Sequence, residues 1–239
     1  MKPVQSPLSF FATPPHRCSY LPAQSAITVF ADPEVPKNAG LYSALSDSGF
    51  RRSGEHLYVP ACKDCRACIP VRVPVAGFRA RRGQRRVRDQ NAALRVVARQ
   101  PVFDEAHFQL YRRYLNARHR GGGMDDPTPE EYLAFLTSTW CPTVFYEFRD
   151  GNEPVAVAVT DRLEDGLSAV YTFFDPTRPR DGLGTYAILW QIEEARRQAL
   201  SYLYLGYLIE PHRKMRYKAD YQPQERLIDG QWVEVSSRP

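Results

Sequence analysis

The sequence lacks any apolar run long enough to cross a membrane. No segment approaches the roughly 18 consecutive apolar residues that a spanning helix requires. The first residues, Met-Lys-Pro-Val-Gln-Ser-Pro, lack the charged and then apolar build of a signal peptide. Internal repeats and low-complexity tracts are also absent. We therefore expect a globular protein of the cytoplasm, without a membrane partner.

Cysteine is scarce, with five among 239 residues, yet three of the five are closely spaced. Without a signal peptide the thiols are expected to stay reduced, which favours metal ligation over disulfide bonds. Cys62, Cys65 and Cys68 form a C-x-x-C-x-x-C motif, and Cys18, beside His16, is the candidate fourth ligand. This spacing suits a structural zinc ion or an iron–sulfur cluster. The alternative is a set of free, partly buried thiols.

Positive charge, in contrast, is abundant and clustered, with a formal net charge of +5. Arginine suits bidentate contact with phosphates, and interleaved aromatic residues can stack on unpaired bases. The clusters therefore favour nucleic-acid contact, although each could also be a solvated face. The three clusters are Arg79, Arg81, Arg82, Arg85, Arg86 and Arg88; Arg112, Arg113, Arg118, His119 and Arg120; and Arg213, Lys214, Arg216 and Lys218, with Met215, Tyr217 and Tyr221 among the last.

The apolar pattern between residues 155 and 221 predicts a hairpin, a glycine loop, a helix and a further strand. Val155–Thr160 and Leu167–Phe174 are rich in β-branched and aromatic residues, and a Glu-Asp-Gly turn separates them. Gly182 and Gly184 then open a helix, and Tyr202–Ile209 reads as a strand. Glycines at a helix N-terminus let backbone N–H groups approach an anion. The alternative is a loop that merely turns the chain.

Upstream of this segment the chain divides into an N-terminal part, residues 1–76, and the start of a larger domain, residues 77–239. Thr128 to Glu131 form a capping box, and Asp104 is a candidate N-cap. The predicted helices span 38–48, 84–91, 104–118 and 128–138, and the predicted strands span 26–30, 57–60, 69–75, 94–99 and 143–148.

Several blocks of the chain resemble one protein family. The most specific block is Leu205-Gly206-Tyr207-Leu208-Ile209, followed by Lys214-Met215-Arg216-Tyr217-Lys218 and Tyr221-Gln222-Pro223. Further matches are Cys18–Pro22, the three spaced cysteines, Ala117-Arg118-His119 with Gly121 and Met124, and Tyr171–Pro176. Over about Cys18 to Trp232 the chain is similar to the aminoacyl-tRNA–protein transferases, and most similar to their bacterial branch.

The resemblance implies a fold like that of the N-acetyltransferase (GNAT) superfamily. This is an α/β (α+β) architecture in which helices flank a mixed sheet, here with a smaller Cys-containing N-terminal part. Gly182 and Gly184 match the glycine loop of that fold, but Pro179 stands where an arginine or glutamine is usual. This departure favours the 3′ end of a charged tRNA over coenzyme A as the donor.

The resemblance also implies an activity. Members of the bacterial branch move leucine from leucyl-tRNA to the α-amine of proteins that begin with Asp or Glu, which marks these proteins for N-end-rule degradation. The ester is already activated, so the chemistry requires no cofactor. Three alternatives stay open: an arginyl-tRNA donor, an acyl-CoA-dependent N-acetyltransferase, and an RNA-binding or iron–sulfur sensor without enzyme activity.

The expected site lies where the strands at 167–174 and 202–209 diverge. An acidic acceptor residue requires a cation, and a leucyl group requires an apolar pocket. Asp161 ends a strand and is a candidate base or ion-pair partner. The candidate residues are Tyr171, Tyr207 and Asp161 for catalysis; Arg51, Arg52, Arg118, Lys218, Gly182, Gly184, Met215 and Tyr217 for substrate binding; Phe173, Phe174, Leu189 and Trp190 for the leucyl pocket; and Arg81, Arg82, Arg85, Arg86, Arg88, Arg213, Lys214 and Arg216 for tRNA.

Overall fold

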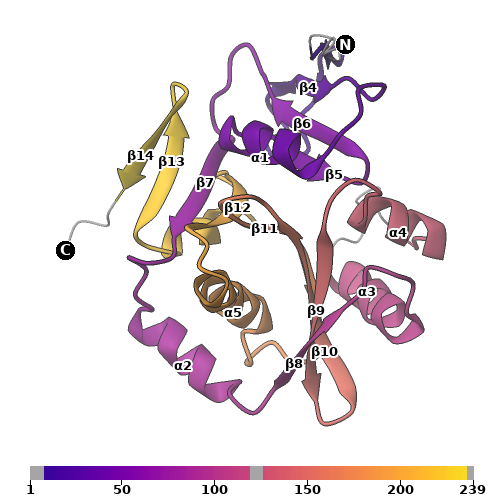
Figure 1. Ribbon diagram of the computed structural model, residues 1–239, viewed down its shortest axis with the longest axis vertical. Coiled ribbons are helices and arrows are strands. Elements are labelled where there is room, and N and C mark those ends of the chain that lie inside the picture. Colours follow the sequence, from indigo (N-terminus) through magenta and orange to yellow (C-terminus); the bar gives the residue numbers. More distant parts are fainter. Residues whose placement is uncertain (1–7, 119–125, 236–239) are drawn as a thin grey trace, which may run out of the picture.

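One large mixed sheet organises the protein, as a computed structural model describes it for residues 8–118 and 126–235 (Figure 1). Its eight strands follow the order β14-β13-β7-β12-β11-β10-β9-β8. Neighbouring strands are antiparallel except β11 and β12, which run parallel. The strands are β7 (Ile69–Pro74), β8 (Arg95–Arg99), β9 (Thr143–Asp150), β10 (Glu153–Arg162), β11 (Gly166–Phe174), β12 (Tyr202–Leu208), β13 (Gln224–Ile228) and β14 (Gln231–Val235).

Helices cover both faces of this sheet (Figure 1). Because side chains alternate along a strand, β10 turns Ala156 and Ala158 to one face and Val157 and Val159 to the other. The alanines pack with α5 (Leu183–Arg197), next to which lies α2 (Arg82–Gln90). The valines pack with α3 (Glu105–Arg118) and α4 (Pro129–Leu136). The sheet is therefore the middle of three layers, which confirms the predicted mixed α/β fold.

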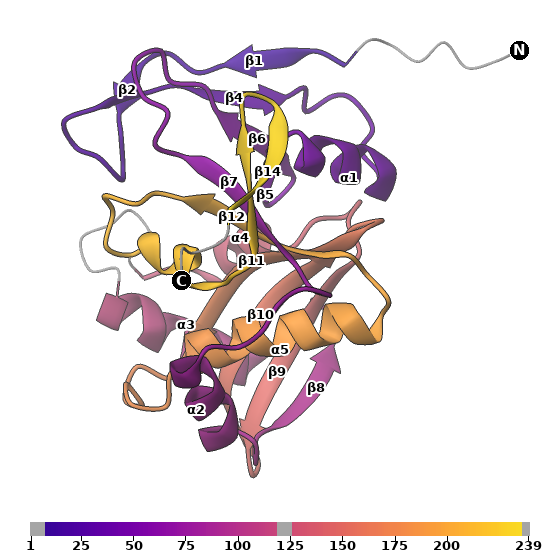
Figure 2. The same ribbon diagram turned by 90° about the vertical axis from the view of Figure 1, so that its left-hand side faces the viewer.

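A smaller sheet stands beside the large one (Figure 2). Its order is β1-β4-β6-β5, and β2 and β3 form a separate pair. Asn38 caps the one helix of this part, because its side chain accepts a hydrogen bond from the Leu41 backbone N–H at 2.9 Å. The elements are β1 (Phe10–Ala12), β2 (His16–Arg17), β3 (Ser25–Ala26), β4 (Thr28–Ala31), α1 (Ala39–Asp47), β5 (Arg51–Ser53) and β6 (His56–Pro60).

The predicted elements are present, and several others are additional: β1, β2, β5, the 3₁₀ helix at Arg216–Asp220, and the hairpin of β13 and β14. The antiparallel pairing of β10 with β11 and the capping box at Thr128 confirm two predictions. The hairpin of β13 and β14 was not predicted, although Asp229 and Gly230 between its strands have φ of 49° and 79°. Asp-Gly at such a turn is a strong hairpin signal. The division of the chain at residue 76 stays a prediction, and β7 lies inside the large sheet.

β11 and β12 separate soon after they meet. Their pairing covers only Gly166–Ser168 against Tyr202–Tyr204, whereas β11 continues to Phe174 and β12 to Leu208. Where they part, β12 carries an irregularity at Gly206, which has a φ of 78°. The predicted divergence of these strands is therefore present. Nowhere in residues 8–118 and 126–235 is there a helix long and apolar enough for a membrane crossing.

Candidate active site

Arg51 of β5 occupies the point where β11 and β12 part. Its Nη1 donates to Ser168 Oγ at 3.0 Å, and its Nη2 donates to the Ala169 carbonyl at 2.7 Å. A Cβ at Gly206 would stand 3.1 Å from Arg51 Nε, so this close approach requires glycine. Arg51 is only 9% exposed. Among the described residues, no carboxylate forms an ion pair with it.

Lys218 is a second buried cation at the same place. It belongs to the 3₁₀ helix η1 (Arg216–Asp220), which follows β12, and is 6% exposed. Its Nζ donates to the Tyr207 carbonyl at 2.7 Å, and the Met215 sulfur lies 4.0 Å away. Burial and the neighbouring Arg51 charge lower the pKa of Lys218 to about 7. Two adjacent cations that lack a carboxylate within the described chain favour an anionic ligand.

The two candidate catalytic tyrosines differ in their hydroxyl groups. Tyr171 lies half-buried on β11, and its hydroxyl oxygen is buried without a hydrogen-bond partner among the described residues. Tyr207 of β12 donates its hydroxyl to the Gly49 carbonyl at 2.9 Å and is close to the Tyr58 carbonyl at 3.3 Å. The Tyr207 hydroxyl therefore already donates its proton to a backbone carbonyl. Tyr171 alone of the pair keeps a free O–H donor.

Asp161 and Arg52 form a structural ion pair away from the opening. Arg52 Nε and Nη2 donate to the two Asp161 oxygens at 2.6 and 2.8 Å, and both side chains are 0% exposed. Thr143 Oγ1 and Tyr42 Oη also donate to this carboxylate, at 2.7 and 3.0 Å. Asp161 is therefore the ion-pair partner, one of its two predicted roles, and the base role is withdrawn because substrate has no access to it. Arg52 is withdrawn as a substrate residue because its fully buried guanidinium is bonded to Asp161 and to the Gly54 and Leu136 carbonyls.

Packing explains the two glycines of the loop before α5. Gly182 caps the helix with a φ of 64°, and a Cβ there would stand 3.1 Å from Val87 of α2. A Cβ at Gly184 would stand 3.0 Å from the Phe174 ring. Asn91 Nδ2 also donates to the Asp181 carbonyl at 2.7 Å, which fixes the loop against α2. Anion binding by this loop stays a prediction.

The four residues predicted for a leucyl pocket do not meet. Phe173 is fully buried among Tyr111 and Tyr132 on the α3 face, whereas its neighbour Phe174 packs against the cluster that contains Leu183 and Tyr186 of α5. Adjacent residues of a strand point to opposite faces, which separates this pair. Trp190 lies on Tyr146, and Leu189 belongs to the core beneath β12. That prediction is wrong for these four residues as a set.

Each of the three basic clusters has a contact with η1 or with the segment before it, or belongs to that segment. Gln84 of α2 donates to the Asp220 carbonyl at 3.1 Å, and Arg81 forms an ion pair with the Asp220 carboxylate at 3.8 Å. Lys214 Nζ donates to the Arg118 carbonyl at the end of α3, at 2.6 Å. These contacts between distant parts of the sequence link the three clusters, and we call the linked clusters the basic surface. His119 and Arg120 of the second cluster, like Gly121, Met124 and residues 1–7, lie outside the described residues.

The exposed face of α2 carries most of this charge. Five of the predicted tRNA-binding residues, Arg81, Arg82, Arg85, Arg86 and Arg88, have exposed side chains. Arg88 pairs with Asp89 at 3.1 Å, and Arg85 donates to the Ala80 carbonyl at 2.7 Å. Within the described chain, no ion pair includes Arg82, Arg85 or Arg86. These three guanidinium groups can therefore meet phosphates without breaking an ion pair.

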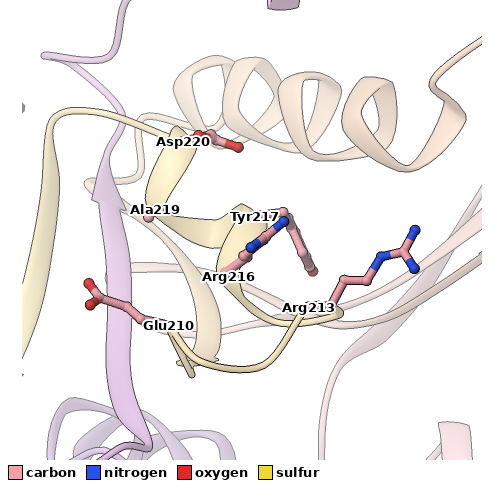
Figure 3. A pocket seen from close by; sticks show the side chains of 6 residues that line it. All are labelled: Glu210, Arg213, Arg216, Tyr217, Ala219 and Asp220. Carbon is pink, nitrogen blue, oxygen red and sulfur yellow. The ribbon is translucent and has the colours of Figure 1, made fainter.

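A shallow cavity of about 430 Å³ opens beside η1 (Figure 3). Its lining consists of Arg213, Arg216, Tyr217, Ala219 and two acidic residues, Glu210 and Asp220. The Tyr217 residue is 43% exposed, yet burial of its hydroxyl and the nearby Tyr114 raise the pKa of Tyr217 to about 12. Lys218 Nζ lies 5.9 Å from the centroid of the Tyr217 ring. Tyr217 thus lies between the cavity and the buried cations.

Cys18, Cys62, Cys65 and Cys68 line a second cavity of about 750 Å³. Burial raises the pKa of the Cys68 thiol to about 11, and the other three thiols contribute to this shift. The four therefore lie close together as free thiols. Among the described residues, however, no group has the arrangement of a metal site, and His16 instead bonds the Pro14 carbonyl at 3.2 Å. A soft thiolate set around one cavity fits zinc or an iron–sulfur cluster in chemistry, so the metal stays a proposal.

Three residues at the site were missed by the sequence analysis. They are Tyr20, Tyr58 and His212. Burial raises the pKa of Tyr20 to about 12, and the nearby Tyr58, Cys68 and Cys18 add to this shift. The Tyr20 ring meets that of His212 edge-on at 5.3 Å, and His212 Nδ1 is buried without a partner among the described residues. Tyr20 and His212 both lie inside or between the family blocks, so their positions in those blocks were the signal that could have identified them.

Comparison with known proteins agrees with this arrangement. The model of the family "Arginine-tRNA-protein transferase, N terminus" matches residues 16–86, and the model of its C terminus matches residues 106–228. The aspartate/glutamate leucyltransferase of Pseudomonas paraeruginosa is 49% identical over 96% of this chain and 97% of its own. The protein of the same name from Pseudomonas fluorescens is 50% identical over the same shares.

Likeness to solved structures is weaker. L-PGS from Bacillus licheniformis has a TM-score of 0.46 and 14% identity, over 59% of this chain and 47% of that one. The GNAT-like fold stays a prediction. The family, in contrast, is shown by the matches to both family models and by relatives that align with 96% of this chain. This chain belongs to the aminoacyl-tRNA–protein transferase family of acyltransferases.

Proposed function

We propose that the protein transfers leucine from leucyl-tRNA to the α-amine of proteins that begin with Asp or Glu, and so marks them for N-end-rule degradation. One observation carries the acceptor side of this proposal. Arg51 and Lys218 are buried together, and neither has a carboxylate partner in the described chain. The leucyl donor follows the names of the relatives that are about half identical to this chain.

The acidic side chain of the acceptor would bind these two cations. A buried charge without a counterion is costly, and a carboxylate in hydrogen-bond contact relieves that cost. The Arg51 guanidinium has five N–H donors, of which Ser168 and Ala169 accept two, so others remain for a ligand. The uncharged or basic first residue of another protein would leave both cations unpaired. Acceptor selectivity follows from this difference.

The tRNA would lie across the basic surface toward the same opening. Arg82, Arg85 and Arg86 of α2 would contact phosphates, and the cavity at η1 would take a nucleotide of the single-stranded 3′ end. In that cavity, Arg213 and Arg216 suit a phosphate and the exposed Tyr217 ring suits a base. Because Tyr217 lies between the cavity and the buried cations, the terminal ester would reach the acceptor amine.

The reaction then forms an amide at the expense of an ester. The neutral α-amine attacks the leucyl carbonyl carbon, the bond to the ribose oxygen breaks, and that oxygen takes a proton. Since an α-amine has a pKa of about 7.7–8.0, a useful fraction is neutral at physiological pH. Holding amine and ester together can supply up to ~7–11 kcal/mol. The free Tyr171 hydroxyl would donate to the developing oxyanion or to the leaving oxygen.

A metal would have a structural role in this scheme. Cys18, Cys62, Cys65 and Cys68 would hold a zinc ion or an iron–sulfur cluster, which would fix the N-terminal part near Tyr20 and Tyr58. The transfer itself requires no cofactor, because the ester is already activated. Elemental analysis after anaerobic purification tests the metal: wild-type protein with zinc or iron, lost in Cys65→Ser, supports it. Wild-type protein free of both metals contradicts it.

A transfer assay tests the function directly. Purified protein is incubated with radiolabelled leucyl-tRNA and peptides that begin with Asp, Glu, Lys or Ala. Label should enter only the acidic peptides, whereas no transfer to any peptide would reject the proposal. Arginyl-tRNA and acetyl-CoA, offered in place of leucyl-tRNA, test the two other donors, and neither should support transfer.

A further inference from the structure

A line of buried hydrogen bonds leads from Asp161 to Arg51. Tyr42 Oη on α1 lies 3.0 Å from Asp161 Oδ2 and 3.2 Å from Ser168 Oγ on β11. Ser168 Oγ in turn lies 3.0 Å from Arg51 Nη1. Tyr42, Asp161 and Ser168 are each 0% exposed. The N-terminal part and the large sheet thus meet in a polar line that ends at the opening between β11 and β12.

The donor and acceptor of each hydrogen bond in this line can be assigned by counting hydroxyl protons. The Asp161 carboxylate can only accept, so Tyr42 donates its single proton to it. The bond between Tyr42 and Ser168 must then be donated by Ser168, which uses the single proton of that hydroxyl. Ser168 Oγ is left as an acceptor, and Arg51 Nη1 fills it. Both hydroxyl groups therefore donate toward Asp161, and Ser168 Oγ accepts the hydrogen bond from Arg51.

The same carboxylate also holds the neighbour of Arg51 on β5. Asp161 binds Arg52 through both oxygens, and Arg52 Nη2 further donates to the Leu136 carbonyl at 3.0 Å. The backbone of β5 and the Arg51 guanidinium are thus fixed from one anchor. A guanidinium held in this way loses little conformational freedom when a ligand binds.

We propose that Ser168 and Tyr42 are positioning residues for the acceptor protein, and this inference rests on the proposed function of Arg51. They hold the guanidinium against Gly206 at the depth where its remaining N–H groups meet the carboxylate of the first acceptor residue. Neither residue touches the tRNA surface formed by α2 and η1. Their loss should therefore weaken the acceptor side of the reaction and leave the donor side unchanged.

Steady-state kinetics of Ser168→Ala and Tyr42→Phe test this inference. With saturating leucyl-tRNA, the KM for an Asp-initiated peptide should rise about tenfold, the size of one hydrogen bond to a charged group. The kcat and the KM for leucyl-tRNA should stay within about twofold of wild type. A general loss of fold would instead lower kcat and affect both substrates. An unchanged acceptor KM in a folded Ser168→Ala variant would overturn the proposal.

Two further variants separate the inference from the function on which it rests. Tyr132→Phe is a matched control, since Tyr132 is fully buried and its hydroxyl has no partner among the described residues, so its kinetics should match wild type. Arg51→Lys alone should raise the acceptor KM. If Ser168 acts through Arg51, Ser168→Ala should add nothing in the Arg51→Lys background.

The outcomes of this cycle are distinct. An acceptor KM that Arg51→Lys leaves unchanged removes Arg51 from the proposed function. An acceptor KM that rises in Arg51→Lys but not in Ser168→Ala, or effects that add fully in the double variant, overturns the positioning role alone. Thermal melts of each variant verify the fold, and Tyr42→Phe provides the same cycle if Ser168→Ala does not fold.

Discussion

Arg51 and Arg52 are adjacent on β5, yet their side chains have different partners and different roles. Both were predicted to be substrate cations, yet Arg51 lies at the opening and Arg52 binds Asp161. A pair of adjacent arginines carries no sign of which will meet a buried carboxylate more than a hundred residues later. Likewise, the sequence presents Tyr171 and Tyr207 alike, and only their hydrogen bonds distinguish them.

Replacing Asp161 by asparagine should destabilise the protein. The change leaves the buried Arg52 charge without its counterion, which costs ~3–5 kcal/mol. Urea denaturation measures this loss as a lower free energy of unfolding. A fully stable Asp161→Asn protein with a large loss of kcat would instead restore the base role.

The buried amine of Lys218 should make stability depend on pH. Its pKa is lowered to about 7 in the folded protein, so between pH 7 and its ordinary value of 10.5 the unfolded chain binds more protons. The free energy of unfolding should therefore rise with pH in this window relative to Lys218→Met, which lacks the titrating group. Chemical denaturation of both proteins at pH 7 and pH 9 measures the difference. A constant difference would show that the amine titrates normally.

The element scale is where the sequence was most informative. Helices with clear caps, such as α1 behind Asn38 and α4 behind Thr128, begin where predicted, because capping is local chemistry. The hairpin of β13 and β14 could also have been predicted, because Asp229-Gly230 is a typical two-residue hairpin turn. The glycines before α5 suggested an anion site, but their neighbours Val87 and Phe174 come from other elements, so their packing role could not be predicted.

The charge on α2 predicts a measurable salt effect. Arg82→Ala with Arg86→Ala should weaken leucyl-tRNA binding and reduce the slope of log K against log salt by about 1 for each lost phosphate contact. Binding titrations at several salt concentrations measure this slope. Arg197→Ala on α5 is the control, because Arg197 is also exposed but already pairs with Glu194 at 2.6 Å. An unchanged slope in the α2 variant would exclude that helix from the tRNA contact.

On the scale of the whole molecule, long-range contacts unite parts that the sequence separates. Composition identified three basic clusters, but their meeting at η1 depends on the bonds from Gln84 to Asp220 and from Lys214 to Arg118. No local pattern encodes such pairings. The predicted site residues Arg51 and Lys218 come from opposite ends of the chain for the same reason.

We expect the chain to unfold as one cooperative unit rather than as two domains. Arg72 of the large sheet binds Asp47 of α1 at 2.7 Å, Trp232 Nε1 donates to the Asp47 carbonyl at 2.9 Å, and Arg52 binds Asp161. Coincident transitions by circular dichroism and tryptophan fluorescence would indicate a single unit. Two resolved transitions would favour independent parts divided near residue 76.

Consecutive residues of η1 face different ways. Tyr217 borders the cavity beside the basic surface, and Lys218 lies inside beside Arg51. If both substrates bind as proposed, one turn of a 3₁₀ helix connects their sites, and a shift of η1 on binding one would change the affinity for the other. Such linkage is reciprocal, so the two substrates would bind with mutual dependence rather than independently.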